Sequence, residues 1–290
     1  MRITQNMIFD TYRSDMMRLQ ESIYKLHKKI STGKEINSLS DDPVKLPRIL
    51  ASRTVLAGYE QYKKNIDYAL SYLNIVETTL DDVKGVLIRI KEVAVTQATA
   101  TTDQTARQTA AKEVSQLFDE LVRLGNTRFE NRYIFSGYKT DTAAFDASGT
   151  YQGDNSEFSL RVDADKTMKV GITGQSVFKT GVDVFSVVSN LITALNSNDT
   201  DGIKTAIAGL DTAFNQVVSV NADLGGRVTR LQTIRDNVES FSTDVRILLS
   251  DMEDANIPEI ITELKAKEVS LSALMASSAK VFQLSIFNYM

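Results

Sequence analysis

Apolar side chains recur at alternating spacings of three and four through the first thirty residues of the chain. This spacing places them on one narrow stripe of an α-helix, which has to be buried against another helix. We expect the partner helix to come from further along the chain or from a second molecule. The residues of this predicted seam are Phe9, Tyr12, Met16, Leu19, Ile23, Leu26 and Ile30.

A second helix is predicted over 259–290, and it carries two apolar stripes. A helix that is apolar on two stripes needs two partners. We expect one partner to be the N-terminal helix and the other a neighbouring subunit. The first stripe is Ile260, Leu264, Leu271, Leu274 and Val281, and the second is Ile261, Met275, Phe282 and Ile286.

The free energy available to the N-terminal seam is modest. Burial of its seven side chains contributes roughly 10–20 kcal/mol, at about 1.5–3 kcal/mol each. Ordering the backbone costs about 1–2 kcal/mol per residue, which helix hydrogen bonds offset only in part. We therefore expect the terminal segments to be disordered in the free monomer and to become helical on assembly.

Composition excludes several classes of protein. The 290 residues carry a formal net charge of −4, which argues against a nucleic-acid-binding protein. There is no cysteine, so disulfides, thiolate metal sites and thiol nucleophiles are excluded. No run approaches the roughly 18 apolar residues of a membrane span, and 1–12 lacks the apolar core of a secretory signal. We expect a cytosolic protein or one exported by a route that removes no signal.

The first helix is predicted to end near Gly33, since glycine readily adopts the left-handed conformation that closes a helix. The next helix is predicted to begin shortly afterwards, with Ser40 or Asp41 as its capping residue and Pro43 in its first turn. A paired-carboxylate site at Asp41 and Asp42 is the alternative, but the sequence offers no partner residues nearby.

Two long helices with a short connection are predicted next, which indicates an antiparallel helical hairpin. The apolar pattern stops in the threonine-rich stretch 96–105, where Asp103 is expected to cap the second helix. The first stripe is Ile66, Ala69, Leu73, Val76, Leu80, Val83, Leu87, Ile90 and Ala94, and the second is Ala106, Ala110, Val114, Leu117, Leu121 and Leu124.

A small β module is predicted between helices at roughly 130–180. Residues 132–145 are rich in aromatic and β-branched side chains, with Gly137 as a break. Two stretches of alternating polarity follow, separated by a turn at 163–166, and this pattern predicts a β-hairpin. The apolar members are Phe158, Leu160 and Val162, then Met168, Val170 and Ile172.

The pattern returns to helical spacing at 184–195 and again over 203–252. Gly225 and Gly226 interrupt the second of these and predict a kink or a close helix approach. The break at 256–258 then separates the terminal helix. The expected layout is nested, with terminal helices outside, a helical bundle within and the β insert innermost.

No catalytic, cofactor or metal site is predicted. His27 is the only histidine, and we expect it on the surface beside the seam. Asp163 and Asp165 resemble the start of a calcium loop, but its glycine and glutamate positions hold Met168 and Gly174. We expect a β-turn there and no enzymatic activity.

Six segments resemble the bacterial flagellin superfamily and, within it, the hook-associated proteins of the hook-filament junction. Together they extend over nearly the whole chain, and the YIFSGYKTDT stretch (133–142) is the most specific of them. The segments are MRITQNMIFDTY (1–12), ISTGKEINSLSDDP (30–43), RLGNTRFENRYIFSGYKTDTAAFD (123–146), YQGD (151–154), ADLGGRVTRLQ (222–232) and LSIFNYM (284–290).

The resemblance implies a mainly α fold with a small β insert: an elongated, flagellin-like rod whose N- and C-terminal helices pair as a coiled coil. By analogy, 1–40 and 251–290 would form the inner coiled-coil domain, 41–134 and 180–250 the helical bundle, and 135–179 the β-rich outer domain. Assembly would use the seam residues already named at both ends of the chain.

The resemblance also implies a structural subunit of the bacterial flagellum that joins the hook-associated zone to the flagellin filament. Its partners would be further copies of itself, the other hook-associated junction protein, flagellin, and a cytosolic export chaperone of the FlgN type that binds the C-terminal helix. Such a protein is secreted to the extracellular flagellum by type III export, without a cleaved signal peptide, and does not insert into membranes. Two alternatives are flagellin itself and an intracellular coiled-coil scaffold.

Overall fold

The structure is a computed structural model that describes the backbone of residues 5–99 and 103–287, and the side chains of 7, 9–99 and 103–280. The expected fold class, mainly α with a small β insert, is confirmed. The chain forms two compact units. We call 1–57 with 242–290 the terminal unit, and 58–241 the central unit. The three-part division expected from the resemblance stays a prediction.

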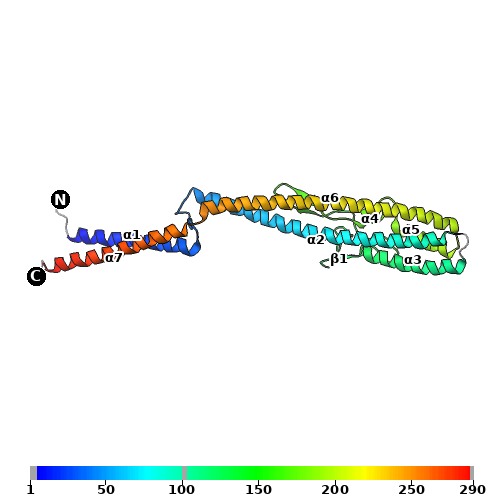
Figure 1. The fold of residues 1–290 in the computed structure, drawn as a ribbon, viewed down its shortest axis with the longest axis horizontal. Helices are drawn as coiled ribbons and strands as arrows, with labels where there is room; N and C mark the ends of the chain where they lie inside the picture. Colours follow the sequence, from blue (N-terminus) through cyan, green and yellow to red (C-terminus); the bar gives the residue numbers. More distant parts are fainter. Residues whose placement is uncertain (1–4, 100–102, 288–290) are drawn as a thin grey trace. The chain divides into compact units, whose positions relative to one another are not determined.

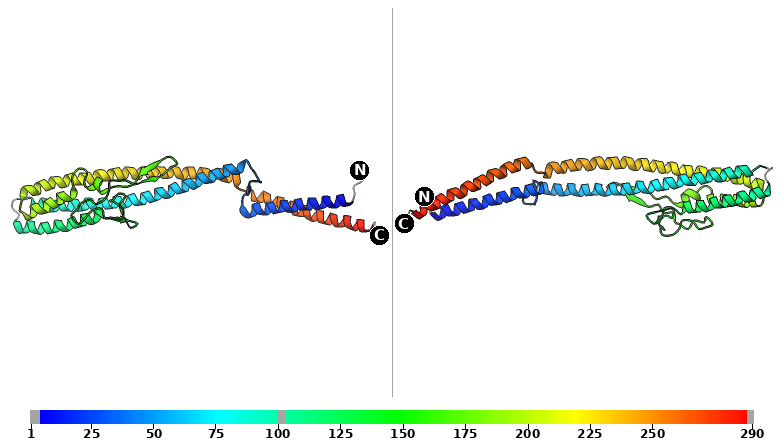
Figure 2. Two further views of the ribbon diagram at one scale, coloured as in Figure 1. Left: turned by 180° about the vertical axis from the view of Figure 1, so that it is seen from behind. Right: turned by 60° about the horizontal axis from the view of Figure 1, so that its bottom comes forward.

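The central unit contains most of α2 (Lys45–Gln97) and α6 (Thr200–Glu253), together with α3 (Gln104–Gly125) and α5 (Val184–Asn196). These helices run alongside one another (Figures 1 and 2). The predicted helical hairpin of α2 and α3 is confirmed, and Asp103 caps α3 by accepting a hydrogen bond from the backbone N–H of Ala106 at 2.7 Å.

The core of the central unit follows the predicted helical stripes. All nine apolar residues predicted between Ile66 and Ala94 are at most 1% exposed. They pack in one cluster with α3, α5, α6 and the β segment. The β segment therefore shares its core with the helical bundle.

Two antiparallel hairpins form the β segment. The predicted one pairs β3 (Ser159–Arg161) with β4 (Thr167–Lys169), and Leu160 lies opposite Met168. The other pairs β1 (Arg128–Phe129) with β2 (Arg132–Tyr133), and the sequence did not reveal it. Its turn residues Glu130 and Asn131 both have positive φ, 48° and 64°, without a glycine. The short helix α4 (Gly174–Phe178) was not predicted either.

Aromatic side chains hold the β segment against the helices. The ring of Phe145 lies 5.1 Å from that of Phe178 and 4.7 Å from that of Phe185, centroid to centroid, and all three are at most 1% exposed. Gly137 has a φ of +68°, and a Cβ there would lie 2.2 Å from the Asp154 carboxylate. This position therefore needs glycine both for its backbone conformation and for space.

The close helix approach predicted at Gly225 and Gly226 is wrong. Helix α6 continues through both residues, and a Cβ at either one would meet no atom within 4 Å. The buried side chains nearby are Leu224 and Leu231, both 0% exposed. They keep the packed side of α6 intact, so the glycines neither bring another helix close nor end this one.

The terminal unit contains α1 (Gln5–Thr32) and α7 (Ile257–Phe287), which lie side by side (Figure 1). Gly33 follows α1 with a φ of +68°, as the sequence predicted. The predicted cap of α2 needs a correction, because Asp42 and not Ser40 or Asp41 receives the N–H groups of Val44 and Lys45, both at 2.9 Å.

Asp41 lies one residue too early to reach those groups and instead accepts from the N–H groups of Asn37 and Ser38, at 2.9 and 2.8 Å. The two adjacent carboxylates therefore stabilise two successive pieces of backbone, as capping predicts and a paired acid site does not.

Across the described residues, no helix has the combination of length and apolarity needed to cross a membrane.

Candidate functional site

Among the described side chains, the buried apolar residues of the α1–α7 seam lie at the end nearest the α1–α2 connection. Leu26 is 5% exposed there, and it packs with Ile260 and Leu264, which are 5% and 9% exposed. Ile23 and Ile30 cover this cluster from the α1 side. Pairing of the two predicted terminal stripes is thus present within one chain over this stretch.

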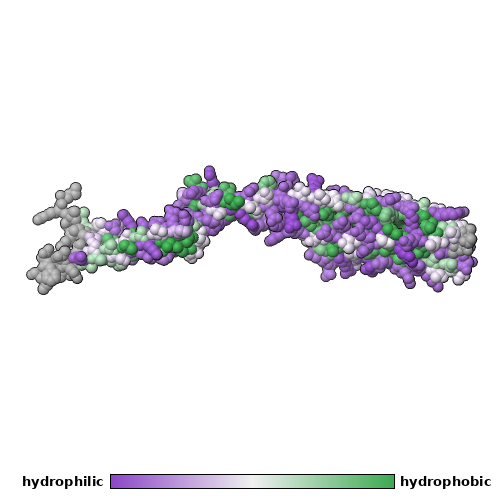
Figure 3. All heavy atoms as spheres, viewed as in Figure 1, coloured by the Kyte–Doolittle hydropathy of each residue, from purple (hydrophilic) through white to green (hydrophobic). Residues whose placement is uncertain are grey.

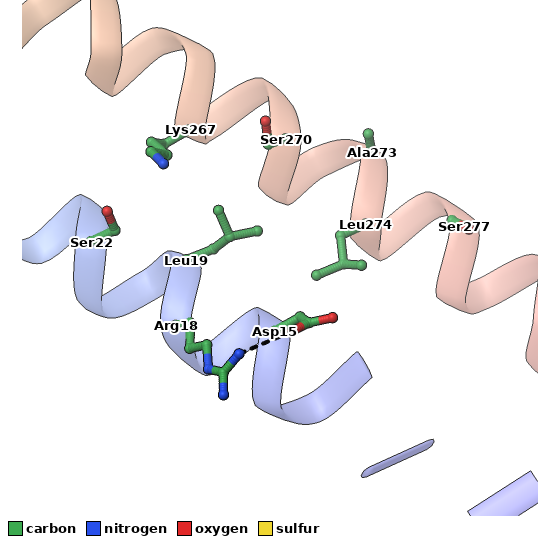
Figure 4. Close-up of a pocket in the computed structure, with 9 residues that line it drawn as sticks. All are labelled: Asp15, Arg18, Leu19, Ser22, Lys267, Ser270, Ala273, Leu274 and Ser277. Atoms are coloured by element: carbon green, nitrogen blue, oxygen red, sulfur yellow. Dashed lines mark ion pairs between the residues drawn. The ribbon is translucent and has the colours of Figure 1, made fainter. Parts of the chain in front are cut away.

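Further along the pair, the two helices enclose an open groove (Figure 4). Leu19 and Leu274 extend from opposite helices into the space between them, and both are half-buried. Asp15 and Arg18 line the same groove, and their side chains form an ion pair at 3.9 Å. The apolar contact is therefore incomplete in this part of the seam.

The other described seam side chains are more exposed than a fully buried helix stripe would be. Phe9 is 48% exposed, and Tyr12, Met16 and Leu271 are half-buried. The remaining three seam side chains lie outside the described part of the chain; they are Val281, Phe282 and Ile286.

Large apolar side chains of the terminal unit lie mainly on its surface. Among the described residues, thirteen large apolar side chains are exposed in this unit and only six apolar side chains are buried. Figure 3 shows apolar residues reaching the surface along the terminal helices. A surface of this kind is typical of a protein that binds another protein. The exposed set is Met7, Phe9, Met17, Tyr24, Leu39, Val44, Leu50, Val55, Ile247, Leu248, Ile261, Val269 and Met275.

Four charged side chains connect the α1–α2 turn to the junction between α6 and α7, and we call them the ionic clasp: Lys34, Arg53, Glu253 and Asp254. Glu253 is 3% exposed, and its two carboxylate oxygens accept from Lys34 Nζ and Arg53 Nη2, each at 2.5 Å. Lys34 Nζ also donates to Asp254 Oδ1 at 2.6 Å.

The electrostatics of the ionic clasp follow from these contacts. Hydrogen bonds to Asp254 and Glu253 raise the pKa of Lys34 above its ordinary value. Hydrogen bonds from Lys34 and Ser250 lower the pKa of Asp254. The sequence analysis missed the clasp, because Lys34 and Glu253 are 219 residues apart and neither belongs to a periodic pattern.

Within the described residues, no group of three or more histidine, aspartate or glutamate side chains is arranged to hold a metal ion. His27 is exposed, as expected. Asp163 lies in the predicted turn, where the N–H of Val162 donates to the carbonyl of Lys166 at 3.0 Å. The candidate site consists of the exposed apolar side chains of the terminal unit together with the ionic clasp.

Comparison with known proteins agrees with the resemblance seen in the sequence. Residues 3–140 match the family model of the bacterial flagellin N-terminal helical region. The chain is 26% identical to flagellar hook-associated protein 3 of Salmonella typhimurium over 313 aligned residues, which cover 99% of each protein. It is 25% identical to the flagellin of Bacillus subtilis, over 98% of this chain and 97% of that protein.

Solved structures show that the fold is shared. A flagellar hook-associated protein from Vibrio parahaemolyticus superposes with a TM-score of 0.70 at 24% identity, covering 74% of this chain and all of that one. FlgL of Bacillus cereus superposes with a TM-score of 0.61 at 20% identity, covering 69% of this chain and 98% of that one. Residues 3–140 therefore match the flagellin N-terminal helical region, and the chain is similar over 99% of its length to hook-associated protein 3 of the bacterial flagellum.

Proposed function

We propose that this chain is a structural subunit of the bacterial flagellum that joins the hook-associated zone to the flagellin filament. The observation that carries the proposal is the apolar surface of the terminal unit, where thirteen large apolar side chains are exposed and six apolar side chains are buried. The chain that bears this surface is similar over 99% of its length to hook-associated protein 3. Burial of an apolar side chain stabilises by about 1.5–3 kcal/mol. Burial of about six of the exposed side chains therefore contributes roughly 9–18 kcal/mol, which is of the same size as the roughly 4–15 kcal/mol that association costs.

Assembly through the terminal helices explains why the seam is incomplete in a single chain. Leu19 and Leu274 line an open groove, and Phe9, Ile261 and Met275 are 48%, 40% and 46% exposed. Neighbouring subunits would cover these side chains, so the seam residues are the assembly residues of this proposal. Far-UV circular dichroism of free and assembled protein tests the accompanying order–disorder prediction, and an unchanged helix content on assembly contradicts it.

The proposal includes the partners and the route that the resemblance implies. The partners are further copies of the chain, the other hook-associated junction protein and flagellin. The route is export without a cleaved signal peptide, after a FlgN-type chaperone has bound α7 in the cytosol. The exposed Val269 and Met275 on α7 are suitable contacts for such a chaperone.

Deletion of the gene tests the function directly. The deletion strain is expected to keep intact hooks, lack filaments and release flagellin into the medium, because the filament has no base to grow from. Electron microscopy of sheared flagella and immunoblots of the medium measure this. Normal filaments in the deletion strain, or a chain found only in the cytosol, would contradict the proposal.

Flagellin itself is the second candidate, supported by the full-length match to the flagellin of Bacillus subtilis. The two functions differ in self-assembly. Purified flagellin grows into long filaments, whereas a junction protein stays monomeric or forms short zones. Electron microscopy and sedimentation of the purified chain at high concentration therefore separate the two.

A further inference from the structure

The terminal unit has two small apolar clusters in place of one continuous core. One contains Leu26, Ile260 and Leu264, and the other contains Ile36, Ile49 and Leu249. The chain passes between the two clusters twice, once at 33–35 and once at 253–255, and each passage contains two charged residues: Lys34 and Glu35, then Glu253 and Asp254. Polar contacts at these two passages therefore fix how one cluster is placed against the other.

Backbone hydrogen bonds join the two passages directly. The N–H of Glu35 donates to the carbonyl of Glu253 at 2.7 Å, and the N–H of Ala255 donates to the carbonyl of Gly33 at 3.0 Å. Between these two bonds, Lys34 and Asp254 lie opposite each other as an isolated antiparallel bridge. The ionic clasp surrounds this bridge.

Glu253 is the most enclosed member of the ionic clasp. Its side chain is 4% exposed, whereas those of Lys34 and Arg53 are 34% and 49% exposed. A buried carboxylate is unfavourable unless cations and hydrogen bonds satisfy it, and here two cations do so from two different segments of the chain. The clasp is balanced, with two positive and two negative groups, so the loss of any one member leaves a charge without compensation.

A buried ion pair adds little net stability compared with apolar side chains of the same size, but it tolerates only one geometry. Its best-supported role is to select one arrangement among several of similar energy. Arg53 belongs to α2 and Lys34 to the turn after α1, so Glu253 can hold both only when α1, α2 and α6 meet in the observed way.

We propose that Glu253 is a positioning residue for assembly: by holding Lys34 and Arg53 together, it fixes the placement of the α1–α7 pair so that its apolar face meets the next copy of the chain in one register. This inference rests on the proposed function. Its energetic basis is preorganisation at the turn: the clasp holds the α1–α2 turn against the α6–α7 junction even where the outer ends of α1 and α7 become ordered only on assembly, so less conformational freedom is lost on binding.

A pair of matched substitutions on α6 tests the inference. Glu253→Gln keeps the size of the side chain and removes its charge. Glu239→Gln is the control, because Glu239 lies on α6 as Glu253 does, but its ion pair with Lys63 of α2, at 3.0 Å, is exposed. Lys34→Met removes the cation that contacts both Glu253 and Asp254, and it is expected to have the same effects as Glu253→Gln.

The first measurement is hydrogen exchange of the Glu35 and Ala255 amides in the purified chain. Exchange reports local opening, so both amides are expected to exchange at least about tenfold faster in Glu253→Gln, with amides of the central unit unchanged. The control is expected to match the wild type. Unchanged protection of these two amides in Glu253→Gln overturns the inference.

The second measurement is the number of filaments restored to the deletion strain per secreted chain. Glu253→Gln is expected to restore several-fold fewer filaments than the wild type and the control. Normal filament numbers despite faster exchange overturn the positioning role and leave the proposed function standing. A folded variant that stays in the cell would place Glu253 in export and also overturn the inference. If the wild-type gene fails to restore filaments, the proposed function is contradicted. The assembly role of Glu253, which rests on that function, is then contradicted as well.

Discussion

The central and terminal units each contain part of the long helices α2 and α6, yet they place apolar side chains differently. Among the described residues, the central unit buries 39 apolar side chains and exposes six large ones, whereas the terminal unit buries six and exposes thirteen. The central unit therefore has a core of its own. The terminal unit exposes the large apolar side chains that neighbouring subunits would cover under the proposed function.

This difference teaches that helical periodicity alone does not show where a stripe is buried. The stripe from Ile66 to Ala94 and the seam from Phe9 to Ile30 follow the same spacing rule. The first is completely buried, and in the second only Leu26 is. A chain that folds the central unit by itself and completes the terminal unit on assembly accounts for both. Four predictions test this comparison.

The largest effect is expected for Phe145→Ala in the central unit. The side chain is 1% exposed and packs against three other rings, so its removal leaves a cavity that destabilises folding by about 3–5 kcal/mol. Urea denaturation of the purified chain measures this. Phe9→Ala in the terminal unit is the control, and its effect on the same transition is expected to stay within about 0.5 kcal/mol. Equal losses in the two variants would remove the distinction between the units.

The next largest effect concerns assembly. Leu271→Asp puts a charge into a half-buried position of the α7 seam, where a neighbouring subunit would exclude water, so filaments are expected to be lost while the central unit stays folded. Filament counts in the complemented deletion strain, together with denaturation of the purified variant, measure both outcomes. Leu271→Met is the volume-conserving control. Normal filaments from Leu271→Asp would show that this face is not an interface.

Helix caps are expected to separate the units by a smaller amount. Asp103→Ala removes the cap of α3 inside the central unit and is expected to destabilise it by about 1 kcal/mol. Asp42→Ala removes the cap of α2 inside the terminal unit and is expected to leave the main unfolding transition in place. Thermal denaturation followed at 222 nm compares them. A matching shift for Asp42→Ala would mean that the two units unfold together.

The smallest expected effect is the pH dependence that two aspartates contribute to the terminal unit. The hydrogen bond from Lys34 lowers the pKa of Asp254, and the N–H of Lys45 lowers that of Asp42. Each folded-state pKa lies below the unfolded value, so each contribution to stability is present above the ordinary aspartate pKa of 3.8 and is lost as the pH falls through the lowered folded pKa. NMR titration of the two carboxyl carbons measures the shifts. An Asp254 that titrates at its ordinary pKa would contradict the ionic clasp in solution.

Much of the fold could be predicted from local pattern. The α2–α3 hairpin, the Asp103 cap, the end of α1 at Gly33 and the β3–β4 hairpin all follow from the sequence, because each depends on residues close together in the chain. The β1–β2 hairpin was missed because Glu130 and Asn131 adopt positive φ without the glycine that usually marks such a turn.

The candidate site was predicted only in part, for a related reason. The sequence identified candidate residues of the seam, but it does not show how far each of them is buried. Leu19 and Leu274 illustrate this, since they lie across an open groove from each other. The ionic clasp could not be predicted, since its four members come from three distant places in the chain and none has a periodic signal.

The sequence by itself determined the helices, their apolar stripes, the position of the β segment and the absence of thiol chemistry, because spacing and residue type act over a few turns of the backbone. Only the tertiary structure decided which stripes find a partner within the chain, which carboxylate caps α2, and that Glu253 holds Lys34 and Arg53 together. Contacts of this kind depend on how distant segments meet in space. No short-range pattern in a sequence encodes that distance.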